Sequence, residues 1–253
     1  MCRQFLLASV GAIALTGSAF AADLTPPPPP VPIFTWTGLY LGGQVGYAWG
    51  HDAANAFIPV AGILIPASIN PQGVIGGAHI GYNLQYNQWL VGVEGTVDGT
   101  SLQGSTSLFS PFGSVTANSR EEIQGSIRAR AGIVWDRFLI FATGGAAFTG
   151  ISNNYSAFLP ALSLSQSSNV SKTRSGWTVG GGLEYALTNN WSVQVEYRYS
   201  DFGHYTDFPF AGVSAVGAVF QASSGHHLTE NQVQAGFSYK FDSFPLAPVV
   251  ARY

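Results

Sequence analysis

Apolar and polar residues alternate along eight segments of the chain. Between 191 and 200, for example, Val193 and Val195 share one side with two tyrosines, while Gln194 and Glu196 share the other. A period of two is typical of a β-strand with one apolar face. The eight predicted strands are 37–49, 74–86, 89–98, 121–134, 138–148, 177–187, 191–200 and 229–241. In 138–148 both faces are apolar apart from Thr143, so the pattern does not assign its sides.

Short and long connections alternate between these strands. Tight turns are expected at Asn87-Gln88, at 135–137 and at 188–190. The other connections are each more than twenty residues long and rich in Ser, Asn, Gly and Pro: 50–73, 99–120, 149–174 and 203–228. Short turns at one end and long loops at the other are typical of a transmembrane β-barrel with periplasmic turns and extracellular loops.

Composition supports an all-β protein that meets something other than water. Hydrophobic residues make up 46% of the chain and charged residues only 9%, against about a quarter charged in soluble domains. The longest apolar run after the N-terminus, 56–67, contains Pro59 and Pro66 and is shorter than the roughly 20 residues of a spanning helix. A soluble barrel or a closed membrane barrel remains.

The charged residues decide between these two barrels. Nine of them share the face that carries the glycines, which has too little bulk for a hydrophobic core: Glu94, Asp98, Arg128, Arg130, Glu184, Glu196, Arg198, Glu230 and Lys240. This face is therefore predicted to line the lumen, with the apolar face toward lipid. A soluble lipocalin-like barrel would have the opposite arrangement. We expect Glu94 and Asp98 to face Arg128 and Arg130 across neighbouring strands.

The lumen charges allow two interpretations. An eight-stranded barrel is just wide enough for side chains to fill, which favours a salt-bridged plug that leaves no pore. The alternative is a narrow polar path for small solutes. The six tryptophans lie at predicted strand ends or turns, where an aromatic girdle is expected at the membrane interfaces: Trp36, Trp49, Trp89, Trp135, Trp177 and Trp191.

The N-terminus resembles an export signal. Arg3 precedes an apolar stretch over 5–15, and Ala19-Phe20-Ala21 offers a small-x-small cleavage site. We therefore predict a signal peptide over 1–21, a proline-rich periplasmic spacer over 22–33 and one barrel domain over 34–253, with a short extension from 242. Cys2, the only cysteine, would leave with the signal. The acidic balance gives no reason to expect nucleic acid.

Several motifs resemble the small outer-membrane surface antigens of rhizobia and brucellae, which are grouped with OmpA-like eight-stranded barrels and often labelled porins. They are the opening Phe34-Thr35-Trp36-Thr37-Gly38-Leu39-Tyr40 and its continuation to Tyr47, the glycine-rich 76–83, Ala142-Thr143-Gly144-Gly145, and 180–185. The resemblance covers about 34–241 and not the loops. Such barrels often end on an aromatic residue like Phe241, yet twelve residues follow, ending in Tyr253. Either aromatic fits the assembly signal.

The sequence predicts no catalysis and no cofactor. It has no P-loop, no dinucleotide-binding glycine pattern and no G-x-S-x-G motif. Candidates for an enzyme site, or for a histidine-held metal or haem, lie in the long connections: His51-Asp52, His204 with Asp207, and His226-His227. Solvated loops are the simpler interpretation of these residues. The predicted function is a non-enzymatic outer-membrane surface protein for envelope integrity and external contacts, with a narrow porin-like channel as the alternative. Expected partners are outer-membrane lipid and lipopolysaccharide, the barrel-assembly machinery, and a host or surface ligand.

Overall fold

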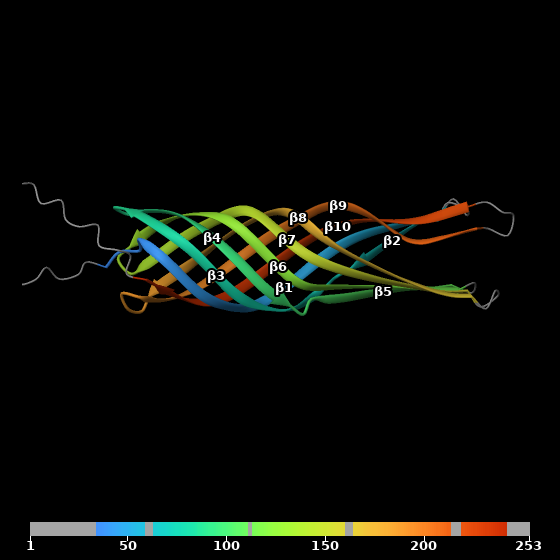
Figure 1. Ribbon diagram of the computed structural model, residues 1–253, viewed down its shortest axis with the longest axis horizontal. Helices are drawn as coiled ribbons and strands as arrows, with labels where there is room; N and C mark the ends of the chain where they lie inside the picture. Colours follow the sequence, from blue (N-terminus) through green and yellow to red (C-terminus); the bar gives the residue numbers. More distant parts are fainter. Residues whose placement is uncertain (1–33, 59–62, 111–112, 160–163, 214–218, 242–253) are drawn as a thin grey trace, which may run out of the picture. The chain divides into compact units, whose positions relative to one another are not determined.

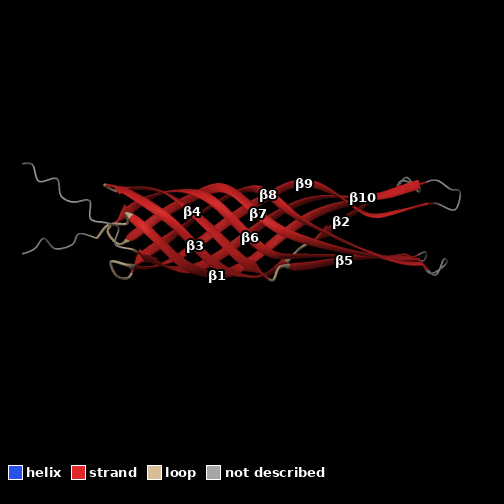
Figure 2. Cartoon of the chain, viewed as in Figure 1, coloured by secondary structure: helices blue, strands red, loops and turns tan. Residues whose placement is uncertain are grey.

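The computed structural model describes residues 34–58, 63–110, 113–159, 164–213 and 219–241. The predicted signal peptide 1–21, the spacer 22–33 and the extension from 242, including Tyr253, lie outside these residues. Within the described part almost every residue belongs to a strand (Figure 2), and no helix there is long and apolar enough to cross a membrane.

The described residues form ten strands. They are β1 (Gly38–Ile58), β2 (Ile63–Ile69), β3 (Gln72–Tyr86), β4 (Trp89–Thr100), β5 (Gln103–Ser110), β6 (Gly113–Trp135), β7 (Phe138–Leu159), β8 (Leu164–Ala186), β9 (Trp191–Val213) and β10 (Val219–Lys240). All of their pairings are antiparallel.

Eight of the described strands close into a ring. Each strand from β3 to β10, apart from β5, pairs with the next ring strand along the chain, and β1 pairs with β10 on one side and with β3 on the other. The β1–β3 ladder runs from Gly38 opposite Asn83 to Trp49 opposite Gln72. The strands cross the barrel obliquely (Figure 1). This ring confirms the predicted eight-stranded antiparallel barrel.

The two faces of the wall follow the alternation in the sequence. On β9, the side chain at Val195 is 55% exposed, whereas its neighbour Gln194, facing the lumen, is 7% exposed. The structure also assigns the sides of β7, where Leu139 and Phe141 are buried inside and Ile140 is exposed outside. Apolar residues therefore cover the outside of the ring, and most inward residues are polar or small.

Two of the tight turns require an unusual backbone. Asn87 and Asp136 have φ values of 53° and 54°. Each lies in the two-residue turn that follows the last cross-strand pair of its hairpin, such as Tyr86 opposite Trp89. Asn and Asp tolerate this left-handed conformation better than most residues. The short connections at this end of the barrel, which we call the turn end, are thus encoded locally.

The long connections differ from the prediction, because most of their residues are strands. β6 to β10 begin or end eight to thirteen residues beyond the predicted bounds, and β2 and β5 lie wholly within predicted loops. In Figure 1 these segments project beyond the far end of the ring, which we call the hairpin end. The alternation did not reveal these segments, because both faces of a projecting hairpin meet water and neither face has to be apolar.

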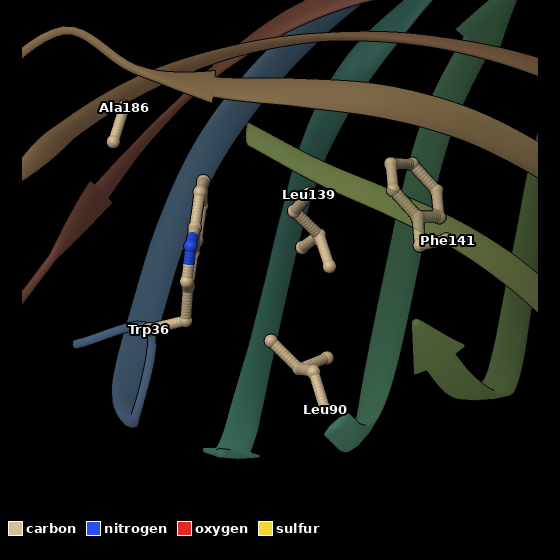
Figure 3. Close-up of a cluster of buried hydrophobic side chains, with 5 residues drawn as sticks. All are labelled: Trp36, Leu90, Leu139, Phe141 and Ala186. Carbon is tan, nitrogen blue, oxygen red and sulfur yellow. The ribbon is translucent and has the colours of Figure 1, made fainter. Parts of the chain in front are cut away.

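Five of the six tryptophans lie on the outer face, as an aromatic girdle requires, and one does not. Trp49, Trp89, Trp135, Trp177 and Trp191 are exposed on the outer face. Trp36 is 4% exposed and points inward, packing with Leu90, Leu139, Phe141 and Ala186 (Figure 3). It precedes β1 but has the parity of the inward-facing Tyr40 and Gln44, so the alternation of β1 continues back to it, and its ring lies at the turn end of the lumen.

We predict that the two faces respond differently to a new charge. Val195→Arg should weaken folding into lipid vesicles by about 2–4 kcal/mol if the residue lies at mid-depth in the bilayer, whereas Gln194→Arg points into the polar lumen beside Glu184 and should be milder. Urea titration with heat-modifiable gel mobility as the readout would compare them. Equal damage from both variants would contradict the assignment of the faces.

Candidate functional site

The lumen of the ring is crossed by ion pairs. Arg128 of β6 contacts Glu94 of β4 through one terminal nitrogen and Glu196 of β9 through the other. β7 and β8 separate β6 from β9 in the sheet, so this single guanidinium links opposite walls. All three side chains are 5% exposed or less. Arg128 therefore occupies space that an open pore would require.

Three further charges extend this contact into one series. Arg130 contacts Glu184 of β8, and its Nη1 lies 3.7 Å from Glu94 Oε2. Arg198 Nη2 lies 3.0 Å from Glu196 Oε2. We call the six residues the ion-pair series; in order they are Glu184, Arg130, Glu94, Arg128, Glu196 and Arg198. Acids and bases alternate along it, and with all six ionised the formal charges cancel.

Neutral side chains add hydrogen bonds to the carboxylates of the ion-pair series. The Tyr40 hydroxyl donates to Glu94 Oε2 at 2.8 Å, and the Thr143 hydroxyl donates to Glu196 Oε1 at 3.0 Å. The Ser192 hydroxyl donates to the Glu184 carboxylate of β8. Buried charges are tolerated when paired and hydrogen-bonded, so these hydroxyls allow the series to remain inside the barrel.

Three of the nine predicted lumen charges do not join the series. Asp98 does not face an arginine as expected: it lies opposite Gln124 and accepts a hydrogen bond from Gln44 Nε2 at 2.6 Å. Glu230 accepts hydrogen bonds from two glutamines at 2.5 and 2.7 Å. Lys240 lies at the turn end, where its ammonium contacts the Thr35 carbonyl. Shared parity places residues on one face but does not set their height in the barrel.

Some buried polar residues were not recognised from the sequence. Glu121 is fully buried inside, although its parity matches that of outward residues such as Ile123. The reason is an irregularity in the β6–β7 ladder between these two positions, which reverses the alternation. His79 is also buried, and its two ring nitrogens each lie 2.8 Å from a neighbour, Gln44 Oε1 and Ser238 Oγ. The alternation along 74–86 puts His79 on the polar face but does not predict these two contacts.

The space left between the lumen side chains is small. One cavity near Tyr40 and Glu184 has about 20 Å³, and another near Asp98 and Arg198 has about 10 Å³. Each is comparable to the room that one water molecule needs. These two cavities do not add up to a path through the barrel.

A second polar group lies above the ring, toward the hairpin end. His226 Nδ1 is 2.7 Å from Asp52 Oδ2, and its Nε2 is 2.9 Å from the Tyr155 hydroxyl. That hydroxyl also lies 3.4 Å from Asp207 Oδ2. Burial, together with the Asp207 carboxylate, raises the pKa of Tyr155, so its hydroxyl keeps its proton and can donate. This hairpin-end cluster joins β1, β7, β9 and β10.

The histidines weighed as catalytic or metal ligands are divided between the two faces. Asp52 and His226 point inward, whereas His51 is exposed and its Nδ1 lies 2.7 Å from Asn70 Oδ1. His204 and His227 stack with centroids 4.1 Å apart. Successive strand residues face opposite sides, which separates neighbours in the sequence. Within the described ranges, no group of three or more His, Cys, Asp and Glu side chains could hold a metal.

A closed ring with an apolar outside and a charged, filled inside defines an outer-membrane β-barrel. The chain belongs to the outer membrane protein beta-barrel domain family, which it matches over residues 6–241. This confirms the resemblance noted from the sequence motifs. The protein is therefore located in the outer membrane, with its apolar face in lipid.

Relatives of this chain are named as outer-membrane proteins. The 31 kDa outer-membrane immunogenic protein of Brucella melitensis is 34% identical over 213 residues, covering 79% of this chain and 88% of the relative. The 22 kDa outer membrane protein of Rhizobium leguminosarum is 31% identical, covering 69% and 68%. The crystal structure of the outer membrane protease OmpT from Escherichia coli shares the fold, with a TM-score of 0.50, 12% identity, and coverage of 84% and 99%.

We predict that Arg128→Ala destabilises the barrel clearly. Removal of the guanidinium leaves Glu94 and Glu196 without their shared partner, a loss of about 3–5 kcal/mol for a buried pair. Arg120→Ala is the matched control: its partner is Glu122, the side chains are 67% and 63% exposed, and such a pair contributes about 0–1 kcal/mol. Urea unfolding midpoints measure both. Similar midpoints for the two variants would show that water enters the lumen freely.

Proposed function

We propose that this protein is a non-catalytic surface component of the outer membrane whose lumen is closed and whose hairpins make contacts outside the cell. The observation that carries this proposal is Arg128, which links β4 and β9 across the lumen. A filled barrel is a rigid support in the membrane rather than a route through it. Its outer partners would be lipid and lipopolysaccharide.

The hairpins supply the contact surface. A spanning β-strand needs about 9–11 residues, whereas β6 to β10 have 22 or 23, so roughly half of each strand is available outside the bilayer. Phe109 near the β5–β6 tip is 82% exposed, so an aromatic side chain is available there for contact. This supports a role in contacts with a host or another surface ligand.

The assembly machinery is the other proposed partner. Phe241 follows β10, and its backbone N–H donates to the Leu39 carbonyl at 2.9 Å, at the seam where the ring closes. Its ring lies edge-on to Tyr239 at 5.1 Å. An aromatic residue at the closing strand fits an assembly signal, with Tyr253 as the alternative.

One arrangement superficially matches a hydrolase. Ser224 Oγ lies 2.9 Å from His226 Nε2, and His226 Nδ1 lies 2.7 Å from Asp52, which is the order of a nucleophile, base and acid. Ser224 is only 5% exposed, however, and Tyr155 occupies the same imidazole nitrogen. We assign the group a structural role. Covalent labelling of Ser224 by a fluorophosphonate would contradict that assignment.

A closed lumen predicts no steady conductance. In planar bilayers the parent protein should remain silent, and Arg128→Ala should show openings because it removes the side chain that links opposite walls. Arg120→Ala, which changes an exposed pair, should remain silent. A parent that conducts steadily, with Arg128→Ala altering only ion selectivity, would support the narrow porin-like channel instead.

The surface role requires the hairpins to be outside the cell. In a Cys2→Ser background, cysteines at Ser107 and Ser168 of the hairpins should react with an impermeant maleimide on intact cells. Cysteines at Gln88 and Asn189 of the turn end should react only after lysis. The reverse pattern would overturn the proposed orientation.

A further inference from the structure

β8 and β9 separate above the ring and leave two strand edges. Their ladder ends with Trp177 opposite Asp201. Beyond this pair β8 continues to Leu164 while pairing with β7, and β9 continues to Val213 while pairing with β10. No described strand pairs with the other edge of β8 from 164 to 176. The backbone groups along that edge are therefore available to another strand.

A bulge in β9 explains why the strands separate at this point. Asp201 pairs with Thr229 and His204 with His227, so Leu228 faces two residues of β9. One of them, Gly203, has a φ of +69° and donates its N–H to Asp201 Oδ1 at 2.8 Å. Bulges of this kind bend a strand and increase its twist. The opening between the strands is thus built into the sequence.

Side chains hold the opening at a limited width. Arg174 Nη2 and Lys172 Nζ of β8 lie 3.2 and 3.4 Å from Asp207 Oδ1 of β9. The Arg174 guanidinium also lies 3.9 Å from the centre of the Tyr205 ring. Contacts between long side chains replace the backbone ladder here. They connect the two strands without any backbone pairing between them.

The β8 edge is the least protected of the described hairpin edges. β2 is seven residues long and contains Pro66, β5 is eight residues long, and β9 contains Gly203 and Pro209. Proline, bulges and short length are the devices that prevent unwanted strand pairing. The β8 segment is longer and contains no proline, and none of its residues from 165 to 176 is buried; 165–167 and 171–173 are exposed.

The charge on this edge selects a partner. Lys172 and Arg174 are the only charged residues from 164 to 176, and a single carboxylate, Asp207, faces both. We propose that the β8 edge is a strand-addition site for an extended, acidic peptide segment of a partner protein. Backbone hydrogen bonds would give affinity and the two cations would select acidic side chains. The proposal rests on the surface-contact role proposed above and specifies its partner.

A direct test uses the full protein in nanodiscs and two labelled octapeptides, one alternating glutamate with threonine and one alternating lysine with threonine. The acidic peptide should bind at least about tenfold more tightly by fluorescence anisotropy. With ¹³C-labelled carbonyls, its amide I band should shift to the β-sheet position on binding. Equal binding of both peptides, or binding without that shift, would overturn the proposal.

Variants separate strand addition from simple charge attraction. Ser167→Pro and Ser168→Pro remove consecutive N–H groups, one of which points to β7 and the other to the open edge. The proline that removes an N–H bonded to β7 should lower the unfolding midpoint. The other proline removes an N–H at the open edge, so it should keep the parent's midpoint and weaken peptide binding by about tenfold. Lys172→Gln should also weaken binding. Strand addition would be refuted if Lys172→Gln lowered the affinity for the acidic peptide while the proline variant with the parent's midpoint kept it. The site would then act through charge alone.

The test is independent of the proposed function on which it rests. Cysteine labelling reports whether the hairpins are outside the cell, and bilayer recording reports whether the lumen is closed. If both agree with the proposed function and the acidic peptide does not bind, only the strand-addition site is wrong. If the hairpins are not accessible from outside, the surface role itself is wrong.

Discussion

Closure of the ring is the constraint on which the rest of the structure depends. Hydrocarbon offers no hydrogen-bond partner, so every backbone N–H and C=O group at membrane depth must pair within the protein. β1 meets this requirement through two ladders, because it pairs with the second ring strand, β3, and with the last, β10. Once the ring is closed, each residue must face either lipid or a narrow lumen.

The narrow lumen explains the composition of the inner face. Glycines allow strands to approach bulky partners: a Cβ on Gly81 would lie 2.3 Å from the Tyr40 hydroxyl, and one on Gly145 would lie 2.1 Å from the Ile127 carbonyl. The remaining volume is filled by a few large side chains, the arginines and glutamates of the ion-pair series. Their signs alternate along the series, so the series itself carries no net formal charge.

A charged interior also specifies which face meets lipid. A one-residue slip in register would exchange the two faces of a strand. If both faces were apolar, the slip would change little; with Arg128 or Glu196 on one face, it would place an ionised group in hydrocarbon. Buried ion pairs often add little stability over apolar residues. Their value here lies in fixing the orientation of the four strands that carry them, β4, β6, β8 and β9. The other ring strands, including the apolar β7, take their orientation from their own alternation and from pairing with these neighbours.

The sequence by itself determined the ring: eight strands, the faces of all of them except 138–148, and the alternation of short and long connections. These features depend on period-two patterning and on residues such as Asn87 and Asp136 that favour the turns. Tertiary structure alone decided the rest. Glu121 turns inward because an irregularity reverses the alternation, and Trp36 finds its packing partners Leu90 and Leu139 on other strands. The pairing of Arg128 with Glu196 depends on the height of each residue around a closed ring. The hairpins beyond the ring form by backbone pairing in water, which imposes no apolar pattern that a sequence could display.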